Sequence, residues 1–592
     1  MPDWTYHTIF KPALTRMPYR AAEKLVFGSM GILARTPPGR LLVRMMGHGS
    51  PSAAMLVERG EHRFAAPTAL GCGVDSCVRG TNAIALFGFG LIEIGPVGST
   101  SQGTHPTWCE GGSIELDANF VMSCDDVAEK LANRVPRENV HVVVRLADVS
   151  VEHVRKLSAL ADGFSISSAD IERLSDIRSA TQLPIYVRVT SGLDSAVEME
   201  PAGFIVEQTT DESLAALATR VADVRSRATE AQVVIAHGRV AEPNEAPPLA
   251  EAGADLVMIQ SGFAASGPGL PKRINRLLEN SAPSKLPRLF SPEASFFWSG
   301  IMGVALFIGG IIATILGTTR VLLPYDEEYL GMLREELCGF NDQILPFMSH
   351  DRVTLAGTML SLGIIYTSCA AFGERRGQRW ARSAVLTSSF IGFLSFFLFL
   401  GFGYFDPLHA FIAAILFQFI LLGLRSPLPD SQPELADHKN DKAWRLGLWG
   451  QLIFVAHGAA ILIGGLVICS FGVTSVFVKE DLEFMQITAN QLQAINPRLV
   501  PLVAHDRASF GGMLLSTGVM VLLTAMWGWR RGQRWLWYAL AAAGTLAYGS
   551  TIVIHWAVGY TSLKHLLPAY AGLITLWLGL LPARGWLCGS SE

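Results

Sequence analysis

The sequence predicts two parts of different class: a shortened α/β barrel of the (β/α)8 (TIM) type, followed by an all-α polytopic membrane domain. Three observations predict this. Eight short apolar runs alternate with helix-length segments before residue 280, eight spans with little or no charge follow residue 295, and the second half repeats itself at an offset of 155 residues. Only 17% of the 592 residues are charged, against about 25% in soluble chains. This composition argues against a wholly soluble or disordered protein.

Residues 1–44 are expected to form amphipathic helices at a membrane surface. Their net charge is about +5, and apolar residues such as Phe10, Leu25 and Leu41 stand among the basic ones. Each cation near an anionic leaflet contributes about 1 kcal/mol to binding. We expect this pair of helices to form a lipid-side entrance to the barrel. The alternative is that the helices only pack on the barrel and dock it to the membrane half. The first residues lack the layout of a signal peptide, so the barrel is expected in the cytoplasm.

The eight apolar runs that predict the barrel strands are FAAPTALG, LIEIGPV, HVVVRLAD, DGFSIS, PIYVRVT, GFIVEQT, VVIAHGRV and DLVMIQSG. Active sites of such barrels lie at the carboxyl ends of the strands. Phosphate is commonly held after strands seven and eight, here at His237-Gly238-Arg239 and Ser261-Gly262-Phe263. The full set of expected mouth residues is Cys72, Pro96, Asp148, Ser168, Arg188, Gln208, His237, Gly238, Ser261 and Gly262.

Eight spans predict eight transmembrane helices, because each is near the 17 to 25 residues needed to cross a bilayer. They cover residues 296–316, 353–373, 383–405, 407–424, 446–472, 508–529, 535–560 and 565–583. One set of loops carries dense clusters of Arg and Lys, and the other set is rich in Asp and Glu. By the positive-inside rule the basic loops and both termini face the cytoplasm of what we expect to be a bacterial inner membrane.

The membrane half contains an internal duplication. LPFMSHDRVTLAGTMLS at 345–361 matches VPLVAHDRASFGGMLLS at 500–516, and RRGQRW recurs at Arg375 and Arg530. Each copy holds four predicted spans, so both enter the membrane from the same side as a 4+4 parallel repeat.

A His-Asp-Arg triplet recurs where a predicted span of each copy begins. One interpretation is a helix N-cap with charges suited to that end, and the other is a paired proton or anion site. The residues are His350, Asp351, Arg352, His505, Asp506 and Arg507. His457 and His555 do not recur between the copies, and we interpret each as a hydrogen-bonded intramembrane histidine.

Other classes of ligand find little support. The net charge is -4, and no zinc-finger spacing, Walker loop or RNP-like motif occurs, so nucleic acid is not an expected partner. The eight cysteines are mostly unclustered, which does not suggest a disulfide framework. Cys72 and Cys77 lack a second pair nearby, and no metal site is predicted.

The segment AGADLVMIQSGFAASGPGLPKRINRLL at 252–278 resembles the end of the quinone-linked, class 2 dihydroorotate dehydrogenases. FAAPTALGCGVDSCVRG and GFGLIEIGPVGST are similar to the first two strands of that family, and the N-terminal helices to its quinone entrance. The resemblance covers residues 5–280. It implies a barrel that binds FMN, with phosphate near Gly238, Ser261 and Gly262, a flavin contact at Arg188 in place of the family's lysine, and Gln208 in place of its asparagine.

The resemblance also implies a role for Ser168, which falls on the family's catalytic serine. That serine removes a proton from dihydroorotate while hydride passes to the flavin, which quinone then reoxidises. Residues that bind orotate in the family are replaced here, among them by Ser165 and Asp170, and the substrate loop is missing. We therefore expect that dihydroorotate is not the substrate.

Two functions follow from these patterns. The first is a membrane flavoprotein of altered substrate range that acts on CH-CH groups and passes electrons to quinone. The second is a catalytically inactive barrel that serves as a cytoplasmic sensing or scaffold domain for a transporting, sensing or binding membrane unit. The expected boundaries are 1–44 (helices), 45–280 (barrel), 281–295 (linker), 296–426 (first repeat), 427–445 (cytoplasmic linker), 446–584 (second repeat) and 585–592 (tail).

Overall fold

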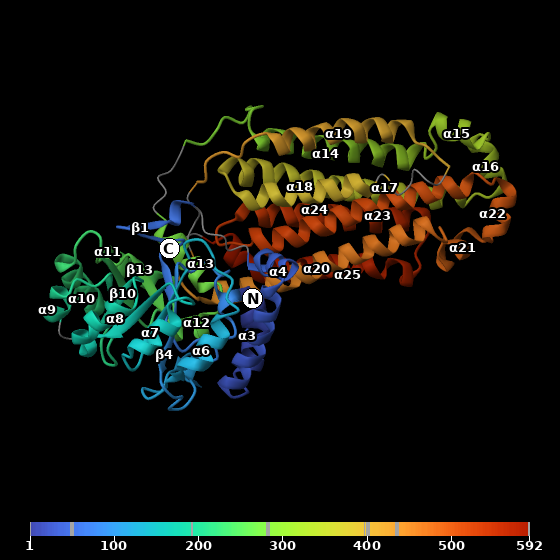
Figure 1. Ribbon diagram of the computed structural model, residues 1–592. Helices are drawn as coiled ribbons and strands as arrows, with labels where there is room; N and C mark the ends of the chain where they lie inside the picture. Colours follow the sequence, from blue (N-terminus) through green and yellow to red (C-terminus); the bar gives the residue numbers. More distant parts are fainter. Residues whose placement is uncertain are drawn as a thin grey trace. The chain divides into compact units, whose positions relative to one another are not determined.

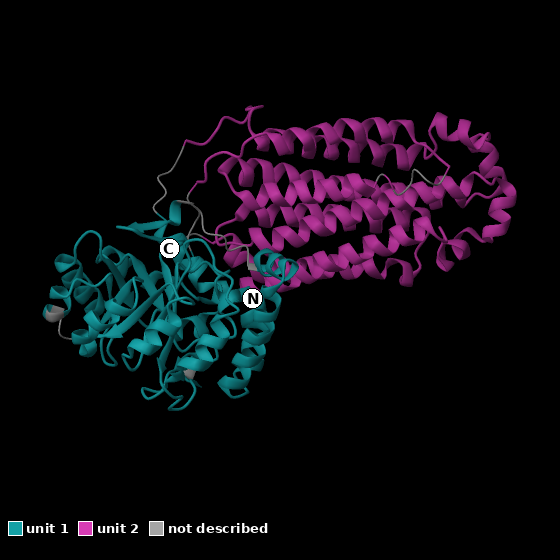
Figure 2. Ribbon diagram, in the orientation of Figure 1, with its two compact units in different colours: residues 1–281, 434–445, 591 teal, residues 282–433, 446–590, 592 magenta. Residues whose placement is uncertain are grey.

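A computed structural model describes residues 2–47, 53–190, 193–279, 285–395, 397, 403–432 and 437–589 of the chain. The chain divides into two compact units, which Figure 2 shows in different colours. Unit 1 comprises Met1–Ser281 and Glu434–Arg445, and unit 2 comprises Ala282–Pro433 and Leu446–Ser590.

Unit 1 contains a closed parallel barrel, as the sequence predicted (Figure 1). Among the described residues eight strands form it, and the last pairs with the first through Met258 and Ala69. All eight apolar runs are confirmed as strands. They are β3 (Thr68–Leu70), β4 (Leu91–Gly98), β8 (His141–Leu146), β9 (Gly163–Ser167), β10 (Ile185–Val189), β11 (Gly203–Glu207), β12 (Val233–His237) and β13 (Leu256–Ile259).

The barrel is short because the helices between its strands are short. The described ones are α5 (Thr81–Ile84), α6 (Cys124–Leu131), α7 (Val151–Leu157), α8 (Leu174–Ala180), α9 (Leu193–Glu198), α10 (Leu214–Arg227), α11 (Pro247–Glu251), α12 (Ser261–Ser266) and α13 (Leu270–Leu278). Small additions flank the barrel: the hairpins β1 (Val57–Arg59) with β2 (His62–Phe64) and β5 (Thr107–Trp108) with β6 (Ile114–Glu115), and β7 (Met122–Ser123) beside β4.

Side chains alternate between the two faces of each barrel strand, and this alternation builds two separate cores. One face packs against the surrounding helices through residues such as Val144, Val187 and Val206. The other face forms a compact apolar cluster that includes Leu91, Val143, Tyr186, Ile205 and Ile235. Two residues further along those five strands, toward their carboxyl ends, the same face carries Glu93, Arg145, Arg188, Glu207 and His237. An apolar layer therefore lies beneath a charged one.

The N-terminal segment is helical, as expected, and packs on the barrel. Its elements are α1 (Asp3–Thr5), η1 (Tyr6–Phe10), α2 (Lys11–Leu14), α3 (Tyr19–Arg35) and α4 (Pro37–Gly47). Tyr19 donates a hydrogen bond to the Val74 carbonyl (2.6 Å), and Lys11 donates one to the Ala265 carbonyl (2.6 Å). Large apolar side chains of α3 and α4 remain exposed, including Leu25, Ile32 and Leu41.

Residues 437–445 also belong to unit 1. The Arg273 guanidinium on α13 donates to Oδ1 of Asn440 (2.7 Å) and lies 4.7 Å from the centre of the Trp444 ring. The segment that the sequence suggested as a linker is thus a packed part of this unit.

Unit 2 is helical, and seven of its described helices are long and apolar enough to cross a membrane. Their apolar spans run over Ser295–Thr319, Ile344–Arg376, Pro407–Arg425, Lys442–Val473, Leu499–Gly528, Arg534–Val558 and Leu563–Leu587. The helices themselves are α14 (Ser295–Thr319), α17 (Ile344–Ser368) with η6 (Cys369–Gly373) and η7 (Glu374–Arg376), α19 (Pro407–Arg425), α20 (Lys442–Val473), α23 (Leu499–Leu523) with η9 (Thr524–Gly528), α24 (Arg534–Val558) and α25 (Leu563–Leu587).

The sequence predicted eight spans, and seven of them correspond to these helices. For the remaining span, 383–405, the structure gives α18 (Arg379–Ser395), and residues 396 and 398–402 lie outside the described part.

Matching elements of unit 2 occur 155 residues apart. Both ends of α17 and α23 are separated by this offset, as are those of the short helices α15 (Pro324–Leu330) and α21 (Lys479–Met485), and of α16 (Arg334–Phe340) and α22 (Ala489–Ile495). Paired glycines let helices pack closely in both halves. A Cβ on Gly310 would lie 2.8 Å from Cγ of Leu360, and one on Gly465 would lie 2.6 Å from the backbone nitrogen of Leu515.

The His-Asp-Arg triplets do not cap helices, so that interpretation is wrong. Helix α17 begins at Ile344 after the N-cap Gln343, and α23 begins at Leu499 after Arg498. His350 and His505 are each the seventh helical residue. These helices start earlier than the sequence predicted because their charged side chains are paired, which offsets the cost of burial.

Candidate functional site

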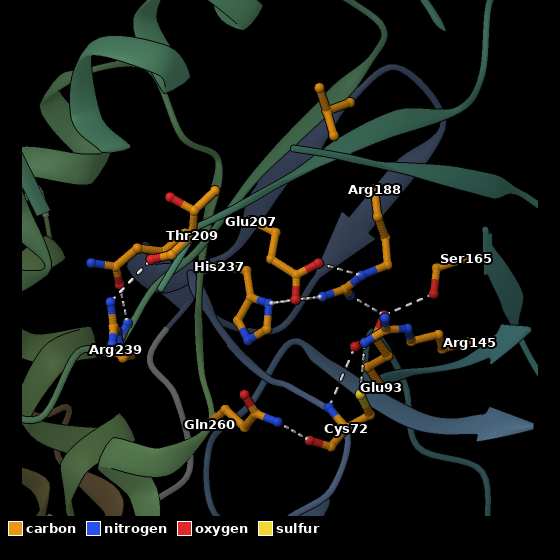
Figure 3. Close-up of polar contacts among 12 residues, drawn as sticks. Cys72, Glu93, Arg145, Ser165, Arg188, Glu207, Thr209, His237, Arg239 and Gln260 are labelled. Atoms are coloured by element: carbon orange, nitrogen blue, oxygen red, sulfur yellow. Dashed lines mark hydrogen bonds and ion pairs between the residues drawn. The ribbon is translucent and has the colours of Figure 1, made fainter. Parts of the chain in front are cut away.

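The charged layer at the carboxyl end of the barrel is a continuous network of hydrogen bonds and ion pairs (Figure 3). Arg188 stands at its centre and is only 3% exposed. Its Nη1 donates to Oε1 of Glu93 at 2.6 Å, and its Nη2 lies 2.7 Å from Oε1 of Glu207. Nη2 is also 2.8 Å from Nδ1 of His237, and Nε donates to Oε2 of Glu207 at 3.2 Å. All three guanidinium nitrogens are therefore engaged.

Residues in or directly after other strands add further hydrogen bonds to this network. Ser165 donates to Oε1 of Glu93 at 2.7 Å, and the backbone nitrogen of Cys72 donates to its Oε2 at 3.4 Å. Gln260 donates to the Cys72 carbonyl at 2.7 Å. Figure 3 shows these side chains converging between the strand ends. The network fills the interior with groups that satisfy one another.

The electrostatics of the network hold its charges in place. Burial is the largest influence on Glu93 and Glu207 and opposes their ionisation, but Arg188 together with other neighbouring cations and hydrogen bonds lowers the pKa of both carboxyls. Burial likewise opposes the charge on Arg188, but the two carboxylates raise its pKa. Burial, followed by Glu93, raises the pKa of Cys72 to about 11, so Cys72 remains a thiol. Two carboxylates and one guanidinium thus form a stable buried ion triplet.

The other residues implied by the resemblance lie around this network. Oε1 of Gln208 accepts from the Arg239 backbone nitrogen at 2.7 Å, which joins the loops after strands β11 and β12. Ser168 opens a 3-10 turn directly after β9 and is half-buried. Ser261 and Gly262 begin α12, which is only six residues long.

The two glycines expected at a phosphate lie close to other parts of the chain. A Cβ on Gly262 would lie 1.7 Å from the Val240 carbonyl oxygen, and one on Gly238 would meet Leu214 and Leu217 within 3.1 Å. Close packing therefore favours glycine at both positions, and phosphate binding there stays a prediction.

These residues do not fit FMN. The position expected to contact the flavin, Arg188, has its donors committed to Glu93, Glu207 and His237. A flavin that entered this layer would leave buried charges unpaired, at a cost of several kcal/mol. Glu93 and Glu207 were missed by the sequence reasoning. Their signal was a carboxylate inside an otherwise apolar strand run, in LIEIGPV and GFIVEQT.

The N-terminal helices enclose a small apolar cavity over the barrel. Its volume is about 60 Å³, and its walls include Tyr19, Phe27, Met30 and Phe263. A cavity that holds benzene measures about 150 Å³, so this space is too small for a quinone ring. A quinone entrance here would require α3 to move.

Glu23 of α3 ties that helix to the barrel. Its carboxylate accepts hydrogen bonds from the Ser76 hydroxyl (2.7 Å) and the Cys77 backbone nitrogen (2.7 Å). Burial and, second, the nearby Asp75 raise the pKa of Glu23 to about 7. The folded state therefore binds a proton that the unfolded chain releases near its ordinary pKa of about 4.3.

Docking of α3 is consequently expected to weaken as pH rises. A raised carboxyl pKa stabilises the protonated folded state, and this advantage is lost between about pH 4.3 and pH 7, amounting to about 3 kcal/mol. Protection factors of α3 amides in the full-length protein, compared at pH 5 and pH 8, measure the change. Glu23→Gln should remove the difference, and the exposed Glu230→Gln should keep it. An equal pH response in Glu23→Gln and Glu230→Gln would show that Glu23 does not cause the pH dependence.

Ion pairs in unit 2 cross between its two halves. Arg352 on α17 lies 2.9 Å from Asp506 on α23 and 3.2 Å from Asp326 on α15. Arg507 on α23 lies 3.3 Å from Asp351 on α17 and 2.8 Å from Asp481 on α21. The triplets that the sequence singled out therefore meet, and each arginine joins carboxylates of both halves.

A cavity of about 310 Å³ lies among the helices of the first half, with contributions from α23. Most of its wall is apolar, from residues such as Leu306, Ala313 and Met359. Its polar end carries Tyr325, Arg352, Asp406, His409, His505 and Asp506. Burial and then Asp406 raise the pKa of Tyr325, which keeps its hydroxyl protonated. The shape and chemistry suit a molecule with an oxygen-bearing head and an apolar tail.

Comparison with known proteins finds relatives for the first half of the chain. A protein of Thermobifida fusca named dihydroorotate dehydrogenase (quinone) is 26% identical over 347 residues, covering 46% of this chain and 91% of the relative. One of Deinococcus deserti with the same name is 25% identical over 338 residues, covering 46% and 94%. The first half of the chain resembles quinone-linked dihydroorotate dehydrogenases.

Solved structures give the same names at low overall similarity. DHODH from Eimeria tenella in complex with ferulenol is 17% identical, covers 40% of this chain and 87% of that one, and has a TM-score of 0.34. The ligand-free form is 18% identical, covers 40% and 91%, and has a TM-score of 0.32. No family model matches the chain. The sequence relatives cover 46% of the chain, in the half that contains the barrel and its N-terminal helices.

Proposed function

We propose that this chain is an integral membrane protein whose helical unit binds a quinone-like amphipathic molecule, and whose dehydrogenase-like barrel is catalytically inactive. The barrel then serves as a cytoplasmic sensing or scaffold domain. The observation that carries the proposal is the buried position of Arg188 between Glu93 and Glu207, which commits the expected flavin contact to the protein itself. The duplication of the helical unit is part of the proposal and rests on the matching elements 155 residues apart.

The membrane cavity supports the choice of ligand. Its 310 Å³ is about five times the space under the N-terminal helices. Polar groups at one end, among them the imidazoles of His409 and His505, can hydrogen-bond to carbonyl oxygens, and the apolar walls can enclose an isoprenoid-like tail. Quinone, the acceptor in the relatives' name, has this chemistry.

Purified full-length protein tests the inactive barrel. We expect a colourless preparation without flavin absorption bands, and no growth of a strain that lacks its dihydroorotate dehydrogenase when the chain is supplied. Bound FMN near one equivalent per chain would overturn the proposal and favour the flavoprotein alternative, which the 91% coverage of a named relative supports.

Quinone binding is tested by filling the cavity. Ala313→Phe places a ring inside it, whereas Ile311→Phe adds the same ring at a neighbouring position of α14 that is 43% exposed and outside the cavity wall. Titration of the full-length protein with decylubiquinone, followed by tryptophan quenching, should show at least a tenfold weaker Kd for Ala313→Phe alone. Equal affinities in the two variants would place binding elsewhere.

The proposed topology makes a separate prediction. The arginine-rich loops predict a cytoplasmic residue 437 and an opposite location for residue 342. Reporters inserted after Asp437 and Asp342 should therefore give cytoplasmic and external signals, respectively. Reversed signals would overturn the orientation, and the role of the barrel as a cytoplasmic domain with it.

A further inference from the structure

We infer that His350, His555 and His565 form a binding site for a transition-metal ion of the zinc class in the helical unit. The three residues come from α17, α24 and α25. One ligand nitrogen from each lies within 4.8 Å of the others. The ring centres are 4.9, 5.1 and 5.7 Å apart. This cluster is separate from the cavity residues proposed to bind quinone.

Hydrogen bonds fix which nitrogen of each ring carries the proton. Nδ1 of His350 contacts the Phe347 carbonyl, and Nδ1 of His555 lies 2.6 Å from the Thr551 carbonyl. A carbonyl oxygen only accepts, so in the neutral rings both protons are on Nδ1. Both Nε2 atoms therefore present lone pairs.

The third ring is oriented by a longer relay. Tyr560 donates to Oδ1 of Asp481 at 2.8 Å, so its oxygen can accept from Nδ1 of His565 at 3.2 Å. Asp481 is in turn paired with Arg507. Metal-binding histidines are typically held in this way, with the second ring nitrogen donating to a carbonyl, carboxylate or hydroxyl.

The resulting arrangement leaves the lone pairs of the rings without donors from one another, although Arg507 already pairs with the neighbouring Asp351. Neutral rings with Nδ1 protonated cannot hydrogen-bond to one another through Nε2. Within the described part of the chain, Nε2 of His555 is buried without a hydrogen-bond partner, and this side chain is 97% buried. Oδ1 of Asp351 lies 3.3 Å from Nε2 of His350 and adds negative charge beside the lone pairs. A cation satisfies all of these groups.

The donor set selects the class of ion. Imidazole nitrogens suit Zn²⁺, Cu²⁺, Fe²⁺ and Ni²⁺, whereas Ca²⁺ and Mg²⁺ require oxygen ligands. Three histidines leave a fourth tetrahedral position for water or for Asp351. Zn–N bonds of about 2.0–2.1 Å place ligand nitrogens about 3.3 Å apart, so nitrogens that now lie within 4.8 Å of one another would close on a bound ion.

Metal content of the full-length protein in detergent tests the site. After chelator treatment and dialysis against Zn²⁺, we expect wild type to hold one equivalent per chain more than His555→Ala. His457→Ala is the matched control, because His457 is also a buried histidine of this unit but bonds to Thr575 and Tyr548. It should retain the wild-type content. Co²⁺ in place of Zn²⁺ should give visible bands that His565→Asp shifts, since it changes one ligand.

Two results would overturn the inference. The first is a wild-type protein that holds no Zn²⁺ after reconstitution, and the second is equal Zn²⁺ in wild type and His555→Ala. If His555→Ala does not give a monodisperse protein, His555→Gln is measured in its place, because it retains a polar side chain without the imidazole ligand. The cluster of Asp406, His409 and His505 is intact in every variant, so it does not affect the difference.

Discussion

Replacement of Arg188 by methionine is expected to lower the free energy of unfolding of the barrel by about 3–5 kcal/mol. The side chain is 3% exposed and its partner Glu93 is fully buried, so the substitution removes the cation that contacts both Glu93 and Glu207 directly. Hydrogen exchange of β8–β12 amides in the full-length protein measures this loss. The destabilisation would follow from the same network that we propose leaves no place for a flavin.

Two further variants identify the cause of that loss. Arg188→Met combined with Glu93→Gln should recover a large part of the stability, because the buried negative charge is removed with its partner. Arg63→Met breaks an ion pair with Glu58 whose side chains are 66% and 54% exposed, and should cost less than about 1 kcal/mol. Equal losses in Arg188→Met and Arg63→Met would contradict a buried, essential ion triplet.

Replacement of Arg507 by methionine is expected to cost about 3–5 kcal/mol in the helical unit. Arg507 is 8% exposed and contacts Asp351 and the fully buried Asp481, so two carboxylates lose their shared cation. Unfolding of the full-length protein in detergent, followed by tryptophan fluorescence, measures the change. A shift in the unfolding transition should accompany loss of the contact between α17 and α23.

The control for this prediction is Arg498→Met. Arg498 is exposed and donates to the Tyr329 carbonyl at 2.6 Å, so its loss should cost less than about 1 kcal/mol. The double variant Arg507→Met with Asp351→Asn should be less destabilised than the sum of its single variants. Additive losses would show that the crossed pair does not couple the two helices.

Periodic patterns made much of this fold predictable. The eight barrel strands follow from apolar runs separated by helix-length segments, and the seven described membrane-length helices follow from their length and composition. Helix starts were less predictable: α17 and α23 begin 9 residues before the predicted spans, because paired charges allow His350 and Asp351 to be buried. Pairing between distant residues is not visible in local composition.

The candidate sites were less predictable than the fold for the same reason. Arg188 and Ser168 were located by a resemblance of short motifs, but the partners of Arg188 come from three other strands. The three histidines stand at 350, 555 and 565, and no spacing relates the first to the others. Only a three-dimensional arrangement shows that their nitrogens converge.

The crossed ion pairs have a consequence for how the two halves of the helical unit can change. Each half supplies the arginine that neutralises a carboxylate of the other, through Arg352 with Asp506 and Arg507 with Asp351. A substitution in one half therefore removes the ion-pair partner of a residue about 155 positions away in the other half. A compensating change would have to occur at that residue. Changes at these four positions are therefore expected to be coupled between the two halves. This dependence gives a physical reason why Asp-Arg occurs at both 351–352 and 506–507, in helices where many other residues differ.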